Sequence, residues 1–534
     1  MKYIELFAGC GGLSLGLTSA GFQLQFANEL SPMAAETYAY NLLGADLTQP
    51  NCPRNTSVKW ISSNYSAEQN AYRLRENPFT YPKLGVGQSD LKGIASFNQT
   101  LLVGDIRQLI DYLTKNTKVV RHLNDKNIDL VSGGPPCQSF SMAGLRDHNN
   151  ERNLLPMDFA NFVNLIRPKV ALLENVSGIL KAFSVKNIKH YAWFEVAKAF
   201  ASNNYFPICL HVNAKYAGAA QNRPRFILIA LRSDVFAKLL YTETSSALYL
   251  ALVEAQRFVE GQLERKSLMP FSDLKYYDVD KDSEFFETSL FSPLIRYTES
   301  TAFTAFDAID DLKENATNQK RNTYWRLLDK TFESQNQFQT KTPTLSNHEK
   351  RLNSIKVRQR FLLYQHLSKL KHNSPNTDNA TLANSIVAFL QNPTTRLLSK
   401  PAICFLKKQR WLSDDGTSYM SFNQDTDLIN YLSKLQTKKQ TQRALVAHKP
   451  APAALSIPDD ACHYDDALQR TLTVRELARF QSFPDWFEFR SKVTTGGQMR
   501  RYEVPQYTQV GNAVPPLLGN ALGLVVANIL KRAR

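Results

Sequence analysis

The strongest constraint on the fold is the alternation of short apolar runs with amphipathic stretches along the first 230 residues. Five runs bounded by Gly, Pro or Asn have the character of buried strands, at 2–7, 24–28, 128–132, 170–174 and 226–231. Stretches with helical spacing lie between them, at 12–20, 33–42, 105–113, 157–166 and 194–202. Because strands that alternate with helices form parallel sheets, the pattern predicts an α/β fold with a doubly wound, mostly parallel sheet.

Two segments depart from this alternation. Residues 44–100 are polar and rich in Asn, Ser, Tyr and Pro, which indicates a surface insertion. From about 235 to 455 the alternation is lost, and Gln, Asn, Ser, Thr and Lys dominate, which indicates a separate, irregular module. Helical patterns return at 473–481 and 515–532. We therefore expect a core at 1–234, a module at 235–455 and a return to the core at 456–534.

The charge of the chain favours an anionic partner. The sequence has 64 Lys and Arg against 48 Asp and Glu, a formal net charge of +16. The excess is concentrated at 341–450, where 18 Lys and Arg stand against 6 Asp and Glu. A basic cluster in this stretch consists of Lys350, Arg351, Lys356, Arg358 and Arg360. With Asn347 and His348 before it, the cluster could bind phosphates and base edges, although a solvated surface is the alternative.

Several classes of protein are disfavoured by the composition. The chain has no apolar run of about 18 residues and no signal peptide pattern at its start, so we expect a cytoplasmic protein that does not enter a membrane. Its six cysteines include no Cys-x-x-Cys pair, which argues against a disulfide framework and against a zinc site. We expect no metal.

A glycine-rich turn follows the first predicted strand. The turn runs Phe7-Ala8-Gly9-Cys10-Gly11-Gly12, and its glycines let the backbone approach a ligand closely. Such a turn could serve a dinucleotide, a nucleoside-type cofactor or only tight packing. Glu29 ends the second strand, where a carboxylate can accept both ribose hydroxyls, and Asp105 could accept an exocyclic amine.

The most specific motif is Gly133-Gly134-Pro135-Pro136-Cys137-Gln138-Ser139. It directly follows a predicted strand, and its prolines stiffen a turn at the edge of the sheet where ligands bind. The side chain that this turn presents is the thiol of Cys137. A thiolate held in this way is a nucleophile, so Cys137 is the candidate catalytic residue.

Together these motifs resemble those of the C5-cytosine-specific DNA methyltransferase family of bacterial restriction-modification systems. Four further motifs support the resemblance in the order expected: Glu174-Asn175-Val176, Gln221-Asn222-Arg223-Pro224-Arg225, the helix at 475–481, and Gly511-Asn512-Ala513-Val514-Pro515-Pro516. One departure is Gly218-Ala219-Ala220, where the family usually has Gly-Val-Pro. The resemblance covers about 1–230 and 465–525, and it implies a Rossmann-like core that uses S-adenosyl-L-methionine and releases S-adenosyl-L-homocysteine.

The resemblance also implies a role for each motif residue. Cys137 would add to C6 of cytosine, Glu174 would hydrogen-bond N3 and the exocyclic amine as an acid, and Arg225 with Arg223 would hold O2. The residues that would line the cofactor pocket are Phe7, Gly9, Gly11, Glu29, Asp105, Ile106, Pro136, Leu155, Asn512 and Val514. Besides the basic cluster, Gln138, Ser139 and Arg146 would contact DNA, Arg146 from a mobile loop. Arg475, Glu476 and Arg479 would brace the core through buried ion pairs.

The expected function is therefore methylation of a cytosine that is flipped out of a specific duplex DNA sequence. The module at 235–455 would recognise the target, and the enzyme, a monomer, would protect DNA from a partner restriction endonuclease. One alternative is the same reaction on RNA, but the Cys-Phe-Thr string typical of that branch is here Cys404-Phe405-Leu406. Another is a catalytically dead DNA-binding protein, which would be expected to lack Cys137, Glu174 or the glycines of the first turn.

Overall fold

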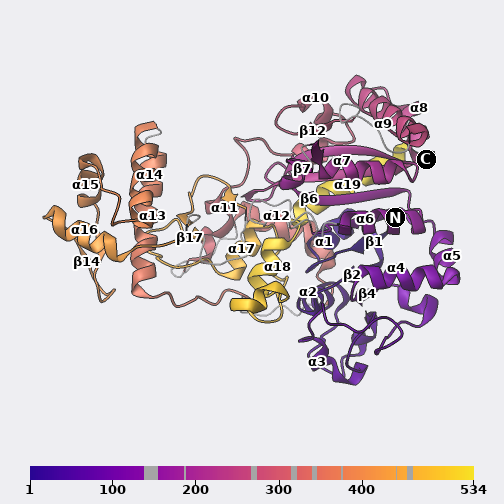
Figure 1. Ribbon diagram of the computed structural model, residues 1–534, viewed down its shortest axis with the longest axis horizontal. Coiled ribbons are helices and arrows are strands. Elements are labelled where there is room, and N and C mark those ends of the chain that lie inside the picture. Colours follow the sequence, from indigo (N-terminus) through magenta and orange to yellow (C-terminus); the bar gives the residue numbers. More distant parts are fainter. Residues whose placement is uncertain are drawn as a thin grey trace.

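The structure is a computed structural model, and it describes residues 1–136, 154–185, 188–265, 274–313, 322–338, 345–373, 377–439, 442–453 and 461–534 (Figure 1). At its centre is a nine-stranded sheet with the order β12-β9-β11-β6-β5-β1-β2-β4-β3. The strands are β1 (Lys2–Leu6), β2 (Gln23–Glu29), β3 (Val58–Trp60), β4 (Thr100–Val103), β5 (Leu130–Gly133), β6 (Val170–Val176), β9 (Tyr205–Asn213), β11 (Pro224–Arg232) and β12 (Tyr276–Asp278). All pairs from β6 to β3 are parallel, whereas β11 runs antiparallel to both neighbours. The mostly parallel α/β sheet is confirmed.

Helices cover both faces of the sheet, because alternate side chains of each strand point to opposite faces. One face packs against α1 (Gly12–Ser19), α8 (Ser233–Thr242) and α19 (Pro516–Arg532), and this cluster includes Tyr3 and Leu172. The other face packs against α4 (Ile106–Lys115), α5 (Thr117–Asp125), α6 (Leu155–Ile166) and α7 (Ala192–Ala201), and its cluster includes Ile4 and Leu173. The long helix α9 (Ser246–Arg265) contributes side chains to both clusters.

The expected boundary of the separate module at residue 235 differs from the structure. Helices α8 and α9 pack on the sheet, and β12 pairs with β9 as a further strand. Their apolar side chains are buried against the core, so this stretch belongs to it. The predicted insertion at 44–100 likewise contributes β3, which pairs with β4 at the edge of the sheet.

A helical body stands apart from the sheet at one end of the long axis of the molecule (Figure 1). We call residues 355–439 the helical module. It contains α13 (Ile355–Asn373), α14 (Thr377–Gln391), α15 (Lys400–Lys407) and α16 (Asp425–Lys434), which surround a hydrophobic cluster of their own. The module is thus more regular than its polar sequence indicates.

Between the sheet and the helical module lie α17 (Val474–Phe480) and α18 (Gln506–Asn512) (Figure 1). Among the described residues, no single helix is long and apolar enough to cross a membrane. A bent pair of helical segments, Gly497–Asn512 with Pro516–Arg532, passes that test by length and composition only.

Candidate active site

The sequence motifs meet at the carboxyl edge of the sheet. Strands β1, β2, β4, β5 and β6 run parallel, so the residues that follow their carboxyl ends lie along one edge. This edge carries the glycine-rich turn, Glu29, Asp105, Pro136 and Glu174. Open α/β sheets bind ligands at this edge.

The turn after β1 has an unusual backbone conformation that leaves space beside Gly9. Phe7, Gly9 and Gly11 all have positive φ angles, of 55°, 56° and 98°. A Cβ atom on Gly9 would meet no atom within 4 Å, so the backbone there faces open space. For the non-glycine residue Phe7 this conformation is strained, which is a feature of functional sites.

Glu29 ties this turn to the end of β2. Its Oε2 accepts a hydrogen bond from the Gly9 amide at 2.8 Å, and its Oε1 accepts one from the Ser31 amide at 2.7 Å. Burial raises the pKa of Glu29, while hydrogen bonds from backbone amides act in the opposite direction. The carboxylate is therefore fixed beside the open backbone at Gly9.

The last motif of the chain packs on the first. A Cβ atom on Gly12 would lie 2.3 Å from the carbonyl oxygen of Val514, so only glycine fits there. Val514 is buried and Asn512 is exposed. Residues near the two ends of the sequence thus form one wall of the same edge.

The neighbouring strand end presents Asp105. Its side chain caps α4 by accepting a hydrogen bond from the Arg107 amide at 2.7 Å, while Ile106 is buried. Asn28 donates to the carbonyls of Leu102 and Gly104, both at 3.0 Å, and so fixes the ends of β2 and β4 relative to each other. Sequence reasoning gave Asn28 no role, although it directly precedes Glu29.

Glu174 and Arg225 form an ion pair on adjacent strands. In the antiparallel register Arg225 is opposite Val176 and Ile227 is opposite Glu174, and Arg225 Nε lies 2.7 Å from Glu174 Oε1. Burial lowers the pKa of Arg225, and the carboxylate of Glu174 counteracts that shift. The acid and the cation predicted from separate motifs are thus brought together.

This pair lies beside the turn that leads to Cys137. A Cβ atom on Gly134 would be 2.9 Å from Glu174 Oε2, so the glycine lets the carboxylate approach the backbone. Asn175 donates to the Pro135 carbonyl at 3.0 Å and holds the turn against β6. Its place in the Glu-Asn-Val motif is the signal that could have identified it.

Four of the predicted residues lie outside the described residues: Cys137, Gln138, Ser139 and Arg146. Pro136, the last described residue before them, is exposed, and Leu155 is partly buried at the start of α6.

Arg223 has a different environment from Arg225. Its Nη2 donates to the carbonyls of Gly511 and Ala513, at 2.8 and 3.0 Å, which flank Asn512. Burial lowers its pKa, and the nearby positive charge of Arg225 adds to the shift. In the structure, the guanidinium of Arg223 therefore holds the C-terminal motif, and Arg225 is the one paired with Glu174.

Helix α17 braces the core, as predicted. Arg470 donates to both carboxylate oxygens of Glu476, at 2.7 and 2.8 Å, and Glu476 also accepts from the Thr473 amide in a capping box. Arg479 pairs with Asp311 and Asp485. The pair of Arg479 with Asp311 joins two segments that are far apart in the sequence, so the bracing role through buried ion pairs is confirmed for Glu476 and Arg479. Arg475 differs from the prediction: among the described residues it forms no ion pair, and it donates to the carbonyls of Pro484 and Phe487, at 3.0 and 2.7 Å.

The expected base-reading role of Asn347 and His348 is wrong. Asn347 is buried and donates to the Phe489 carbonyl at 2.8 Å. The ring nitrogens of His348 contact Thr473 Oγ1 and the Leu312 carbonyl, and burial lowers its pKa. Both side chains therefore join segments that are distant in the sequence, through Phe489, Thr473 and Leu312.

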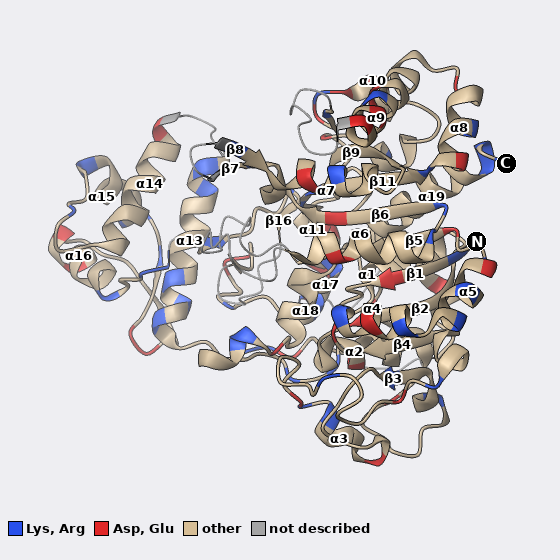
Figure 2. Cartoon of the chain, turned by 45° about the vertical axis from the view of Figure 1, so that its right-hand side comes forward, with Lys and Arg blue, Asp and Glu red and all other residues tan. Residues whose placement is uncertain are grey.

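The basic cluster divides into two kinds of side chain. Lys350 and Lys356 are exposed, and Arg351 is partly buried. Arg358 donates to the Gly416 carbonyl at 3.3 Å, and Arg360 donates to the Leu435 carbonyl at 3.1 Å. Figure 2 shows Lys and Arg residues distributed along α13. Some of these cations therefore stabilise the helical module itself.

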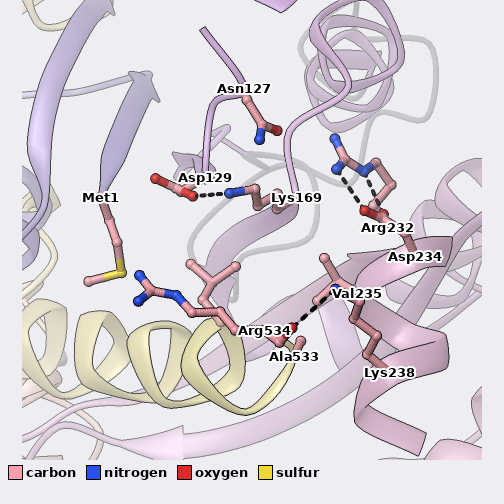
Figure 3. A pocket seen from close by; sticks show the side chains of 11 residues that line it. Met1, Asn127, Asp129, Lys169, Arg232, Asp234, Val235, Lys238, Ala533 and Arg534 are labelled. Atoms are coloured by element: carbon pink, nitrogen blue, oxygen red, sulfur yellow. Dashed lines mark hydrogen bonds and ion pairs between the residues drawn. The ribbon is translucent and has the colours of Figure 1, made fainter.

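A cavity of about 320 Å³ opens at the opposite, amino edge of the sheet (Figure 3). Four of its charged side chains form two ion pairs: Lys169 Nζ lies 2.7 Å from Asp129 Oδ1, and Arg232 Nε lies 2.7 Å from Asp234 Oδ1. None of the motif residues lines it. The geometry of the carboxyl edge therefore makes that edge the candidate active site.

Known proteins with similar sequences include type II methyltransferases. The chain is 24% identical to the type II methyltransferase M.DdeI of Desulfomicrobium norvegicum, over 98% of this chain and 87% of the relative. It is 25% identical to M.AgeI of Thalassovita gelatinovora, over 98% of each. A solved structure of a putative DNA modification methyltransferase encoded within an E. coli prophage aligns over 99% of both chains, with 19% identity and a TM-score of 0.43.

The family model of the C-5 cytosine-specific DNA methylases matches residues 1–51 and 97–527. The match includes every motif that forms the carboxyl edge and leaves out 52–96, which is most of the predicted insertion. The chain therefore belongs to the C-5 cytosine-specific DNA methylase family.

Proposed function

We propose that this DNA cytosine-5-methyltransferase acts on a cytosine flipped out of duplex DNA, through a covalent bond between Cys137 and C6 of the base. The observation that carries the proposal is the ion pair of Glu174 and Arg225 beside Gly134. An acid and a cation are fixed beside the turn that leads, three residues after Gly134, to Cys137, the only thiol in the motif.

The residues at the carboxyl edge fit S-adenosyl-L-methionine as the cofactor. Open space over the Gly9 backbone gives room for a ligand, and the fixed carboxylates of Glu29 and Asp105 suit ribose hydroxyls and an adenine amine. The pocket would be completed by Phe7, Gly11, Ile106, Pro136, Leu155, Asn512 and Val514. When bound, the cofactor supplies an electrophilic methyl group on a sulfonium, and it leaves as S-adenosyl-L-homocysteine.

Three side chains of the protein then activate the cytosine. Cytosine C5 is a poor nucleophile, so the thiolate of Cys137 adds to C6 and gives C5 the character of an enamine carbon. Glu174 hydrogen-bonds N3 and the exocyclic amine, and Arg225 stabilises charge that develops at O2. Loss of the C5 proton and cleavage of the bond between Cys137 and C6 restore the aromatic ring.

Arg223 acts as a positioning residue in this proposal. Its guanidinium is held by the carbonyls of Gly511 and Ala513, so it keeps the C-terminal motif against the glycine-rich turn. Its role as a second guanidinium on O2, expected from the sequence, receives no support from these contacts.

The helical module would recognise the target in duplex DNA, with exposed cations of the basic cluster on phosphates. Gln138, Ser139 and Arg146 would contact the DNA near the flipped base. Since the relatives M.DdeI and M.AgeI are type II methyltransferases, we propose that the modification protects DNA from a restriction endonuclease with the same target.

Bisulfite sequencing tests the proposal. DNA from a bacterial host without cytosine methylation of its own would be compared after expression of the wild type and of Cys137→Ala. We expect methylated cytosines in one sequence context with the wild type and none with the variant. Cys404→Ala is the matched control, because Cys404 is exposed on the helical module. Methylation by Cys137→Ala, or none by the wild type, would contradict the mechanism.

A further inference from the structure

The insertion that the family model leaves unmatched, residues 52–96, is organised by buried charged groups. Arg73 is buried, pairs with Asp90 and lies over the ring of Trp60 at 5.3 Å. Glu76 accepts hydrogen bonds from the Ser63 hydroxyl and the Asn64 amide, both at 2.7 Å. Buried groups with satisfied partners give the insertion a defined conformation.

The insertion packs against the cofactor side of the carboxyl edge. Strand β3 pairs with β4, and a Cβ atom on Gly104 would lie 2.9 Å from the Cβ of Ile61. The Pro82 carbonyl accepts hydrogen bonds from Ser62 Oγ at 2.6 Å and from Gln108 Nε2 at 3.3 Å. Gln108 lies in the first turn of α4, three residues after Asp105, so the insertion borders that site.

Tyr81 stands out in this contact. Its ring packs edge-to-face on Trp60, with centroids 6.4 Å apart, and against the cluster that includes Ala8 of the glycine-rich turn. Its hydroxyl oxygen is buried and has no hydrogen-bond partner among the described residues. Burial raises the pKa of Tyr81, and the carboxylates of Glu76 and Glu29 are near enough to add to the shift. A second buried atom without a partner in this part of the structure is Gln108 Oε1.

A buried hydroxyl without a partner is unfavourable, because it has lost its hydrogen bonds to water. The packing of Tyr81 does not need the oxygen, since a phenylalanine ring would make the same contact with Trp60. A partner absent from the protein chain itself would explain why a tyrosine is kept beside Glu29.

We propose that Tyr81 belongs to the cofactor pocket and that its hydroxyl hydrogen-bonds the nucleoside part of S-adenosyl-L-methionine. This inference rests on the proposed function and adds a cofactor-binding residue from a segment outside the family match. The insertion then forms the wall of the pocket on the side of β3 and β4.

The test compares binding of S-adenosyl-L-homocysteine to the wild type and to Tyr81→Phe by calorimetry. We expect Tyr81→Phe to bind about three- to tenfold more weakly, the loss of one neutral hydrogen bond. Without ligand, the variant should unfold at the same or a higher temperature, because it removes a buried hydroxyl without a partner. Tyr72→Phe is the matched control, since Tyr72 lies on the same insertion and is 60% exposed.

Each outcome decides the inference. Wild-type affinity in Tyr81→Phe would overturn it, and so would weaker binding together with a lower unfolding temperature, which would show that the hydroxyl supports the insertion. Glu29→Ala separates this from failure of the proposed function. If the wild type binds S-adenosyl-L-homocysteine and Glu29→Ala does not, the cofactor pocket is correct and only the role of Tyr81 is at stake.

Discussion

The carboxyl edge and the helical module use their charged side chains in different ways. At the edge, charged groups from distant segments contact one another or backbone from far along the chain, as Glu174 does with Arg225 and Arg223 with Gly511. In the helical module, Arg358 and Arg360 donate to carbonyls within the module. A motif at a strand end therefore predicts where its side chains will lie, whereas a run of cations does not reveal which of them are available to DNA.

Among the variants that test this difference between the two regions, we expect the largest loss of activity at Glu174. Glu174→Gln keeps the size of the side chain but removes the acid and its charge beside Arg225. We expect the rate of methyl transfer to fall by about 10² to 10⁴, the usual contribution of general acid-base catalysis, with unchanged affinity for S-adenosyl-L-homocysteine. Single-turnover kinetics and calorimetry measure the two quantities. A variant with wild-type rate would place the acid elsewhere.

Replacing Arg223 should mainly lower the stability of the protein, whereas replacing Arg225 should mainly lower its activity. Arg223→Ala leaves the carbonyls of Gly511, which is partly buried, and Ala513, which is buried, without this donor, so the free energy of unfolding should fall by about 2–4 kcal/mol. Arg225→Ala should mainly lower the rate of methyl transfer. Denaturant unfolding of both variants measures the difference. Equal stability of Arg223→Ala and the wild type would contradict the positioning role.

Much of the edge could be predicted from the sequence, because the glycine-rich turn, Asp105 and Pro136 each follow a strand whose end the fold places there. The partner of Arg223 could not, since the carbonyls of Gly511 and Ala513 lie almost 300 residues further along the chain. Strand β9 was not identified, because Pro207 within it resembles a strand breaker, yet Pro207 is paired with Ala230 of β11.

The helices of the module were also not predicted. Asn, Gln and Lys residues interrupt their apolar spacing, so α13 shows no clear amphipathic pattern although Phe361 and Leu363 are buried. Burial in such a body depends on contacts among several helices, which a reading of one segment at a time does not detect.

We expect the stability of the protein to depend on pH through Glu5, a buried residue near the carboxyl end of β1. Glu5 is buried on β1 and accepts a hydrogen bond from Ser14, and burial raises its pKa from 4.5 to about 8. The folded state therefore favours the protonated acid of Glu5. Its contribution to the free energy of unfolding is fully present below pH 4.5 and is lost as the pH rises toward 8. Each pH unit in that window removes up to about 1.4 kcal/mol.

Glu5→Gln checks this dependence, because the amide has no charge to lose. Denaturant unfolding of the two proteins between pH 5 and 8 should show the variant gaining stability relative to the wild type as the pH rises. Parallel curves for the two proteins would show that Glu5 titrates normally.

We expect the smallest effects in the helical module, where an exposed cation and a cation bonded to backbone carbonyls can be compared. Lys356→Ala should weaken binding of duplex target DNA a few-fold and reduce the salt dependence of log K by about one phosphate contact. Arg360→Ala should instead lower the stability of the module, since its guanidinium holds the Leu435 carbonyl. Lys118→Ala is the control, because Lys118 is exposed on α5, which packs on the sheet. Salt titrations that show no change for Lys356→Ala would place the DNA elsewhere.

The most direct test of the account is to trap the covalent bond at Cys137. Duplex DNA with 5-fluorocytosine at the target would be incubated with S-adenosyl-L-methionine and the wild type, and the modified peptide would be identified by mass spectrometry. Because fluorine blocks removal of a proton from C5, the account predicts a stable adduct on Cys137 and none with Cys137→Ala. An adduct on another residue, or none under conditions in which ordinary DNA is methylated, would contradict it.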